Sequence, residues 1–539
     1  MTVFSKIKTI TCELPKWFLP ALLVLLGGIL RFVQLGNVPG GIFQDEAIVA
    51  WNAYALLHEG IDSAGHAWPV YMADWGDGHS ALYVWLTIPF IALNGGHVNS
   101  FICRLPQAIV GTITLIAVYA LMKRLFNRTM GLWALFLLAI CPWHIMMSRW
   151  GLDVDLVPGF LIFSLYFFVR GMEDQRFLLL SALGYGLCLH CYAVIWPIVP
   201  IMLALQILYG LFHHKLRIDK WSLLATLLLA VMALPMILFV LVNAGYLPEI
   251  SLPFLTIPQM GGYRGSEIAL NFSEMYRNLR TAITLFVRQN TGAPYDFLLP
   301  WGLFYDIGRV FIVIGAVLLT IKVIRSAFVE KKFCHEYFLF VQLLGGGITC
   351  LLVTAKLHQI NALFLPLVLC EAYGIYTVTE FIRAHKEGIA KACSAALVAV
   401  YLFCLILFQR DYYTDYKELV GAYFAEGLED CLQYAQAQCE TLGIDTITVE
   451  KGAQWPRLLM YTETLPSRYL ASVTYDEYPA PARFDTNEGL HINTRINYEE
   501  ITQESIYIFY EFDVPTFEKD FELTCYGGHW YVGVPKNTN

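Results

Sequence analysis

The chain has 539 residues, of which 57% are hydrophobic and only 15% are charged, and its mean hydropathy is +0.53. Soluble globular chains carry about 25% charged residues, so this composition argues against a soluble or a disordered protein. The net charge of −8 and the isoelectric point near 5.9 lack the basic excess that nucleic-acid binding requires.

Twelve apolar segments follow one another along the chain, and most are long enough to cross a hydrocarbon core of about 30 Å. They are 17–35, 80–94, 104–122, 130–148, 156–170, 177–191, 194–212, 221–243, 307–325, 336–354, 361–382 and 389–408. If 80–94 lies at the membrane surface and the others cross, 18 Lys and Arg fall in the connections on one side and six on the other. The positive-inside rule then predicts a cell-membrane protein with eleven crossings, a cytoplasmic N-terminus and an extracytoplasmic C-terminus.

The charge balance changes near residue 410. Residues 410–539 contain 9 Lys+Arg and 22 Asp+Glu, whereas residues 1–409 contain 27 and 22. The tail combines an amphipathic stretch at 418–440 with β-rich stretches at 445–450, 506–512 and 529–534. We therefore predict a transmembrane domain over 1–409 and a small extracytoplasmic α/β domain over 410–539.

The first outer segment, 36–103, contains six acids and neither Lys nor Arg. Asp45 and Glu46 begin a stretch with helical periodicity at 45–58. A carboxylate pair at a membrane surface can act in general-base catalysis. The alternative is a solvated helix start, because the helix dipole stabilises acids in the first turn.

Asp153 and Asp155 follow Arg149 on the next short outer turn. Two carboxylates one residue apart can chelate Mg²⁺ or Mn²⁺ that also holds a phosphate, or they can cap the following helix. Arg149, together with Lys356 and His358 on a later outer loop, offers groups that suit a lipid phosphate. Snorkelling of long side chains at the interface is the alternative interpretation.

These acids and bases gather at one membrane face, whereas a transporter more often places ionisable residues at mid-membrane. The pattern favours an enzyme over a lipid or solute transporter. A non-catalytic scaffold whose acidic outer domain binds a partner is the second alternative.

Several motifs stand in an order that is typical of one enzyme group. The early ones are Pro39-Gly40-Gly41-Ile42-Phe43-Gln44-Asp45-Glu46, Gly95-Gly96, Arg104-Leu105-Pro106, Lys123-Arg124-Leu125-Phe126-Asn127-Arg128, Cys141-Pro142-Trp143-His144 and Ser148-Arg149. The later ones are Gln289-Asn290, Phe304-Tyr305 and His358-Gln359-Ile360-Asn361. Over about residues 1–382 the chain resembles the GT-C membrane glycosyltransferases, in particular the protein O-mannosyltransferase and aminoarabinose-transferase group.

The resemblance implies a GT-C-like fold with interfacial helices, an extracytoplasmic active site and a donor in which polyprenyl phosphate carries the sugar. The family's first-loop acid, its proposed base, corresponds to Asp45, with Glu46 beside it. Its second-loop acid corresponds to Asp153 or Asp155, and the motif does not choose between them.

The chain departs from many relatives at the entry to its interfacial helix. It has Asp77-Gly78-His79-Ser80-Ala81-Leu82-Tyr83 where they have a Lys-Pro-Pro-like sequence. This departure leaves the donor and acceptor identities open, and His79 and Tyr83 of the same stretch are the residues expected to contact sugar or phosphate.

The implied reaction is transfer of a hexose or pentose to a protein, lipid or glycan of the cell envelope, in contact with membrane lipids. Asp45 is expected to deprotonate the acceptor hydroxyl. Arg149, Lys356 or a divalent cation at Asp153 and Asp155 is expected to neutralise the departing phosphate. Since no sequence feature points to a covalent sugar–enzyme intermediate, we expect inversion at the anomeric carbon.

Overall fold

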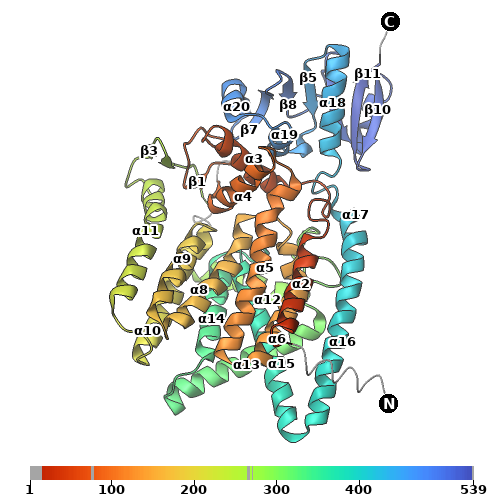
Figure 1. The fold of residues 1–539 in the computed structure, drawn as a ribbon. Coiled ribbons are helices and arrows are strands. Elements are labelled where there is room, and N and C mark those ends of the chain that lie inside the picture. Colours follow the sequence, from red (N-terminus) through yellow and green to blue (C-terminus); the bar gives the residue numbers. More distant parts are fainter. Residues whose placement is uncertain (1–14, 75–77, 264–267, 270, 537–539) are drawn as a thin grey trace.

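The computed structural model describes residues 15–74, 78–263, 268–269 and 271–536. Lys6, Lys8 and Arg264, which belong to the counts of Lys and Arg in the connections, lie outside these residues, and so does Asp77 of the motif before the interfacial helix. A bundle of long helices carries a smaller sheet-containing domain at one end (Figure 1). We call the end of the bundle that carries this C-terminal domain the outer end.

Among the described residues, seven helical stretches are long and apolar enough to cross a membrane, and five apolar helices are shorter. The long stretches contain α5 (Ser100–Leu125), α8 (Val157–Gly171), α10 (Ile198–Phe212), α11 (Lys220–Asn243), α13 (Asp306–Arg325), α15 (Asn361–His385) and α16 (Glu387–Asp411). The shorter helices are α2 (Phe18–Phe32), α4 (Leu82–Leu93), α6 (Arg128–Ile140), α9 (Leu178–Leu189) and α14 (Glu336–Leu352). The expected class, a multi-pass helical membrane protein with a C-terminal sheet domain, is confirmed, and the count of eleven crossings stays a prediction.

The burial of the helices follows their place in the bundle. Within an apolar stretch of 18 residues in α15, 78% is buried inside the protein, whereas the corresponding value for α11 is 22%. The exposed side chains of α11 are apolar, with Leu227 60% and Val231 59% exposed. Such a face is unfavourable in water and is suited to lipid.

The expected crossing over 130–148 is broken in the structure. It divides at Cys141 into α6 and the short α7 (Pro142–Met147). Pro142 occupies the first turn of α7, where its missing N–H costs nothing, but it ends the hydrogen-bond ladder of α6. The bend leaves residues 148–156 at the outer end, where they form a turn and a short 3-10 helix (Asp153–Leu156).

The remaining outer elements surround this turn. They are α3 (Gln44–His58), β1 (Tyr71–Met72), β2 (His79–Ser80), β3 (Ile250–Leu252), β4 (Leu255–Ile257) and α12 (Phe272–Arg288). The hairpin β1–β2 pairs Tyr71 with Ser80 and thereby carries His79. The helix expected at 45–58 is present as α3, whereas α12 was not expected.

The C-terminal domain is a seven-stranded mixed sheet with helices, in the order β10-β11-β9-β5-β8-β7-β6. Its strands are β5 (Thr446–Val449), β6 (Thr474–Glu477), β7 (Ala480–Asp485), β8 (His491–Asn493), β9 (Ile506–Tyr510), β10 (Phe521–Tyr526) and β11 (Trp530–Pro535). Its helices are α17 (Lys417–Val420), α18 (Leu428–Leu442), α19 (Trp455–Tyr461), α20 (Pro466–Ser472) and α21 (Val514–Phe517). The central strand β5 pairs in parallel with β8 and β9, and the other neighbours are antiparallel.

The C-terminal domain packs directly on α3. Trp51 donates its indole N–H to the Thr464 carbonyl at 2.8 Å, and Arg457 donates to the Ile42 carbonyl at 2.8 Å. Gly41 has φ +74°, and a Cβ there would lie 2.2 Å from the Phe424 carbonyl oxygen, so only glycine permits this approach. One apolar core therefore runs from α3 into the sheet domain, and the predicted domain boundary near 410 stays a prediction.

Candidate active site

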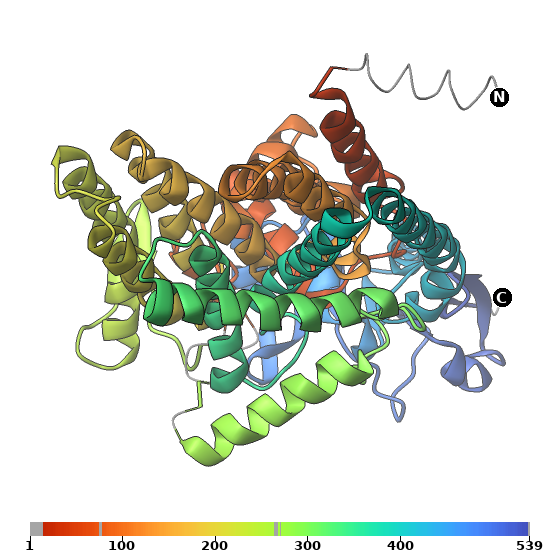
Figure 2. The same cartoon turned by 90° about the horizontal axis from the view of Figure 1, so that it is seen from below.

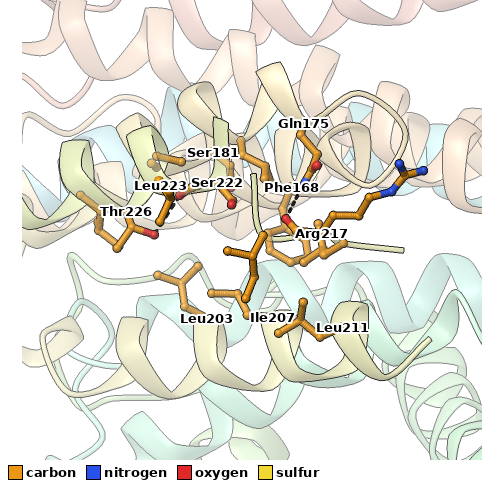
Figure 3. A pocket seen from close by; sticks show the side chains of 16 residues that line it. Phe168, Gln175, Ser181, Leu203, Ile207, Leu211, Arg217, Ser222, Leu223 and Thr226 are labelled. Atoms are coloured by element: carbon orange, nitrogen blue, oxygen red, sulfur yellow. Dashed lines mark hydrogen bonds between the residues drawn. The ribbon is translucent and has the colours of Figure 1, made fainter. Parts of the chain in front are cut away.

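The structure has two cavities of about 330 Å³ whose linings differ in chemistry. The first lies among α8, α9, α10 and α11. Figure 3 shows Leu203, Ile207, Leu211 and Leu223 on its wall, together with the uncharged polar side chains of Gln175, Ser181, Ser222 and Thr226. Arg217 is the charged residue among its described lining residues. The second is polar and lies at the outer end. Because the transfer reaction expected from the sequence needs charged groups, the second cavity is the candidate site.

Acids and bases from four stretches of the chain line this polar cavity. Its charged residues are Asp45, Asp74, Asp153, His79, Lys356 and His358. Five of the nine residues predicted from the sequence thus meet around one space. Glu46, Tyr83, Arg149 and Asp155 do not line it.

Asp45 is brought to the cavity by the start of α3. Phe43, in extended backbone, precedes the helix, and its N–H donates to a Glu46 carboxylate oxygen at 3.0 Å. Consecutive residues on an α-helix point about 100° apart, so Asp45 and Glu46 serve different surroundings. Asp45 faces the cavity, whereas Glu46 is fully buried.

Glu46 ties three segments together. It accepts two hydrogen bonds from the Arg104 guanidinium, at 3.0 and 3.1 Å, and one from the Gly151 N–H at 2.8 Å. With the Phe43 bond, both oxygens of Glu46 are engaged. The structure therefore does not support Glu46 as a catalytic group, and places it as the residue that holds Asp45 beside the turn carrying Asp153.

Asp153 and His79 form another part of the cavity lining. Asp153 accepts the Ser80 N–H at 3.0 Å and the Val154 N–H at 2.7 Å, so its carboxylate is held toward β2. The His79 Nδ1 lies 2.7 Å from an Asp74 oxygen. Burial by itself would lower the pKa of His79, but the carboxylates of Asp74 and Asp153 outweigh it, and the pKa is raised. The His79 Nε2 is buried and has no hydrogen-bond partner among the described residues, which leaves it for a ligand.

His358 is held as a cation. Its Nδ1 lies 3.3 Å from Asp155 Oδ1, and its Nε2 lies 3.8 Å from Asp296 Oδ1. Burial acts to lower the pKa of His358, but Asp155, Asp296 and Asp45 overcome it and raise the pKa to about 9. His358 is therefore protonated at neutral pH. Asp155 stabilises the charged form of His358, and it also accepts the Asn361 side-chain N–H at 2.8 Å.

Lys356 supplies a second cation from the same loop. It is exposed and lines the cavity, and no ion pair joins it to another described residue. An ammonium group in this position is available for an anionic ligand.

The donor set at Asp153 and Asp155 does not fit the expected divalent cation. Asp153 lines the cavity, whereas Asp155 turns to His358 and Asn361. Within the described residues, no group of three or more His, Cys, Asp or Glu side chains is arranged to hold a metal. We therefore assign no step of the reaction to a metal at this pair.

Arg149 and Tyr83 do not have the expected roles. The Arg149 guanidinium donates to the backbone carbonyls of Leu30, Arg31, Val33, Gln34 and Val38 and to the Tyr412 hydroxyl. All its nitrogens are thus used by the protein, and the side chain is buried. Tyr83 is fully buried and donates to the Cys103 carbonyl at 2.9 Å. Neither group is available to a phosphate or a sugar.

Four further polar lining residues were not predicted to act in the site, and they are Gln44, Asp74, Tyr192 and Gln359. Asp74 carried a usable signal, because it lies five residues before His79 in the acid-rich outer segment. Tyr192 follows an apolar helix and carried none.

Comparison with solved structures identifies the fold. ArnT from Cupriavidus metallidurans, bound to undecaprenyl phosphate, matches with a TM-score of 0.53 at 11% identity, over 95% of this chain and 97% of ArnT. The chain has the GT-C fold. The apo form of the same ArnT matches with a TM-score of 0.52, also at 11% identity and with the same coverage. At such identity the match establishes the fold of this membrane protein and not its substrates.

Two other comparisons cover a smaller part of this chain than the ArnT match does. A profile of the family described as dolichyl-phosphate-mannose-protein mannosyltransferase matches residues 78–242. The oligosaccharyltransferase of Archaeoglobus fulgidus matches at 14% identity and a TM-score of 0.48, over 82% of this chain. The chain spans 60% of that archaeal protein. No curated protein matches by sequence.

Proposed function

We propose that this protein is a membrane glycosyltransferase that moves a hexose or pentose from polyprenyl phosphate to an acceptor hydroxyl at the extracytoplasmic face. The observation that carries the proposal is the polar cavity at the outer end, where Asp45 and Asp153 face Lys356 and His358. The donor class is supported by the ArnT structure with undecaprenyl phosphate and by the dolichyl-phosphate-mannose profile.

The donor phosphate would bind between Lys356 and His358. A sugar phosphodiester carries one negative charge, and two cations in a partly buried site stabilise both it and the charge that develops on departure. His79, through its Nε2, and Asp153 lie where they would bind sugar hydroxyls. These groups orient the anomeric carbon toward Asp45.

The lipid tail has a suitable path beside the cavity. An apolar groove of about 290 Å³ is lined by residues of α10 and α11 and by Leu189 and Trp196. Tyr192, which lies between these two in the sequence, lines the polar cavity. A lipid-linked donor would therefore place its phosphate in the cavity and its isoprenoid chain in the groove.

The chemistry follows from these positions. Asp45 takes the proton of the acceptor hydroxyl, and the acceptor oxygen forms a bond to the anomeric carbon. The bond from that carbon to the phosphate oxygen breaks, and its electron pair stays on the phosphate beside Lys356 and His358. The products are an inverted glycoside and polyprenyl phosphate.

The central test is transfer of labelled sugar from a panel of polyprenyl-phosphate sugars by the full-length protein in nanodiscs. Asp45→Asn keeps the shape of the side chain and removes its basic oxygen. We expect turnover to fall by about 10²–10⁴-fold, the usual contribution of a general base. Binding of polyprenyl phosphate, measured separately, should stay within about twofold, because the cations are intact.

Asp415→Asn is the matched control, since Asp415 is an exposed acid that does not line the cavity. Its turnover should equal that of the unmodified chain. Normal turnover by a folded Asp45→Asn protein would remove the base assignment. Lack of transfer from every donor, together with uptake of solute or lipid into proteoliposomes, would favour the transporter alternative.

A further inference from the structure

A second polar space, of about 400 Å³, adjoins the candidate active site. We call it the aromatic cleft. Its walls come from the first outer segment with His66 and Asp74, from the loop after β4 with Gln259, and from the C-terminal domain with Trp455 and Tyr478. Asp74 lines both the aromatic cleft and the active-site cavity, so the two spaces meet at this carboxylate.

The aromatic cleft continues over the C-terminal domain. A third hollow, of about 230 Å³, shares Trp455, Tyr478 and Pro479 with it. The cavity, the cleft and the hollow thus form a series that leads from Asp45 to the surface of the sheet. Three adjoining spaces suit an extended ligand better than a single small molecule.

The aromatic rings at the cleft range from buried to largely exposed. Trp455 and Tyr469 are buried and stack at 6° with their centroids 6.2 Å apart. The Tyr469 hydroxyl lies 3.4 Å from that of Tyr475, whose ring centroid is 5.5 Å from that of Tyr478. Tyr475 is 39% exposed and Tyr478 is 71% exposed. Two partly exposed rings in contact with each other, both lining a polar cleft, form a surface of the kind that binds ligands through aromatic faces.

The lining indicates the class of ligand. The charges are nearly balanced, with Asp74 and His66 in the cleft, and Lys451 and Arg495 against Asp476 and Glu477 in the hollow. This balance does not suit a strongly anionic polymer, which needs a basic surface. A sugar ring presents a C–H face and a rim of hydroxyls, and these match aromatic faces interleaved with carboxylate, imidazole and amide groups.

We propose that the aromatic cleft binds the acceptor, and that the acceptor is a neutral glycan whose terminal hydroxyl reaches Asp45 past Asp74. This inference rests on the proposed glycosyl transfer and names its acceptor class. The rings of Tyr475 and Tyr478 hold internal sugar units, while the terminal unit enters the active-site cavity.

The first experiment measures glycan binding without any donor. Full-length protein in nanodiscs is applied to immobilised neutral gluco-, manno- and galacto-hexasaccharides, with a library of unstructured peptides in parallel. The double variant Tyr475→Ala/Tyr478→Ala removes the exposed rings and leaves the buried Trp455–Tyr469 pair. We expect at least one hexasaccharide to be retained by the unmodified chain and about tenfold more weakly by the double variant.

Phe512→Ala is the matched control, because Phe512 is an aromatic residue of the same domain, 82% exposed, that does not line the cleft. Its retention should not change. Retention of no hexasaccharide, or equal retention by the double variant, would overturn the proposal. Retention of peptides in place of glycans, lost in the double variant, would also overturn it and would assign the cleft to a polypeptide acceptor.

The second measurement separates this inference from the proposed function. With a donor that supports transfer, the double variant should raise the KM for the glycan about tenfold and leave kcat and polyprenyl-phosphate binding unchanged. A change in polyprenyl-phosphate binding would overturn the assignment of the cleft to the acceptor. If no donor supports transfer but tyrosine-dependent glycan retention persists, the glycan site stands and the transferase proposal fails.

Discussion

Three buried arginines bind backbone carbonyls, and two of them, Arg104 and Arg149, organise the irregular segment between α2 and α3. Arg149 binds five carbonyls of residues 30–38, and Arg104 binds those of Leu35, Pro39 and Gly41. Arg31 binds carbonyls of α2 and α6. A guanidinium offers five donors in a fixed plane, so it can satisfy a loop that has no regular hydrogen-bond ladder. This use explains why a charge near the predicted membrane surface is not available to a phosphate.

Glu46 gives the first prediction at this scale. Glu46→Gln leaves the Arg104 charge buried without a counter-charge, and removal of one partner of a buried pair costs about 3–5 kcal/mol. We expect a clear fall in the thermal unfolding midpoint of the detergent-solubilised protein. Glu387→Gln, which breaks an exposed pair with Lys391, should shift the midpoint little. Equal midpoints for the two variants would contradict the assigned role of Glu46.

The raised pKa of His358 predicts how the binding of polyprenyl phosphate depends on pH. Its pKa is raised to about 9, so the cation is present below that value and is lost as the pH rises through it. Binding of polyprenyl phosphate should be constant from about pH 7 to 8 and weaken by about tenfold above pH 9, as one charge-assisted hydrogen bond is lost. His358→Gln should bind more weakly at pH 7 and show no such transition. A transition that persists in His358→Gln would assign it to another group.

Sequence reasoning found Asp45, Asp153, His79, Lys356 and His358 because each is a polar residue in an outer connection. It could not separate residues that face the cavity from those that hold the backbone. Glu46 differs from Asp45 only by the 100° between neighbours on a helix, and that direction depends on where Arg104 packs. The use of Arg149 depends likewise on carbonyls more than 100 positions away.

At the scale of elements, α12 is an amphipathic helix that exposes both an apolar stripe and a basic, polar face. Figure 2 shows it, in lime green, along one edge of the bundle. Asn278, Ala282 and Leu285 form one stripe of the helix, which is buried against the protein. A second stripe, which is apolar, is exposed. This exposed stripe contains Phe272, Tyr276, Leu279, Ile283 and Val287. With Arg277, Arg280 and Arg288 nearby, α12 has the composition of a helix lying in a membrane interface.

We predict that α12 rests in the lipid interface. A fluorophore on Ile283→Cys should emit at shorter wavelength and be quenched by brominated lipid, because Ile283 lies on the apolar stripe. The same fluorophore on Thr284→Cys, one residue along on the exposed polar side, should be quenched several-fold less. Equal quenching at both positions would contradict an interfacial orientation.

Helices with continuous apolar character were predictable, because the lipid requires about 20 apolar residues whatever the tertiary contacts. Elements whose pattern depends on contacts were not. The break between α6 and α7 could have been predicted only by reading Pro142 as the start of a new helix. The helix α12 was missed because its arginines interrupt the apolar pattern in a loop of mixed composition. In the C-terminal domain β5, β9 and β11 coincide with β-rich stretches, whereas the exposed β6 carries no alternation of buried and exposed residues.

For the whole molecule, the decisive feature is the contact between the C-terminal domain and α3. It places the sheet domain over the first outer segment and sets one wall of the aromatic cleft. The charge pattern of the loops predicts that both lie outside the cell. The candidate active site, the aromatic cleft and the C-terminal domain would then share one compartment.

The orientation can be tested by cysteine labelling of intact cells. In a background with Cys525→Ser, which removes an exposed cysteine of the C-terminal domain, Asp415→Cys should react with a membrane-impermeant maleimide. Arg217→Cys should react only after the membrane is permeabilised. The reverse pattern would place the candidate active site in the cytoplasm and end the proposed extracytoplasmic transfer.

The ties that hold Asp45 have a consequence for how the protein is made. The segment that leads into α3 is synthesised early, yet its carbonyls bind Arg104 and Arg149, and the Ile42 backbone binds Phe424 and Arg457. None of these partners exists when the ribosome has completed only α2. The wall that carries Asp45 is therefore the first part of the candidate site to be translated, whereas the contacts that fix it need residues of the C-terminal domain. A nascent chain completes the candidate site only after its C-terminal domain has packed onto the segment that leads into α3.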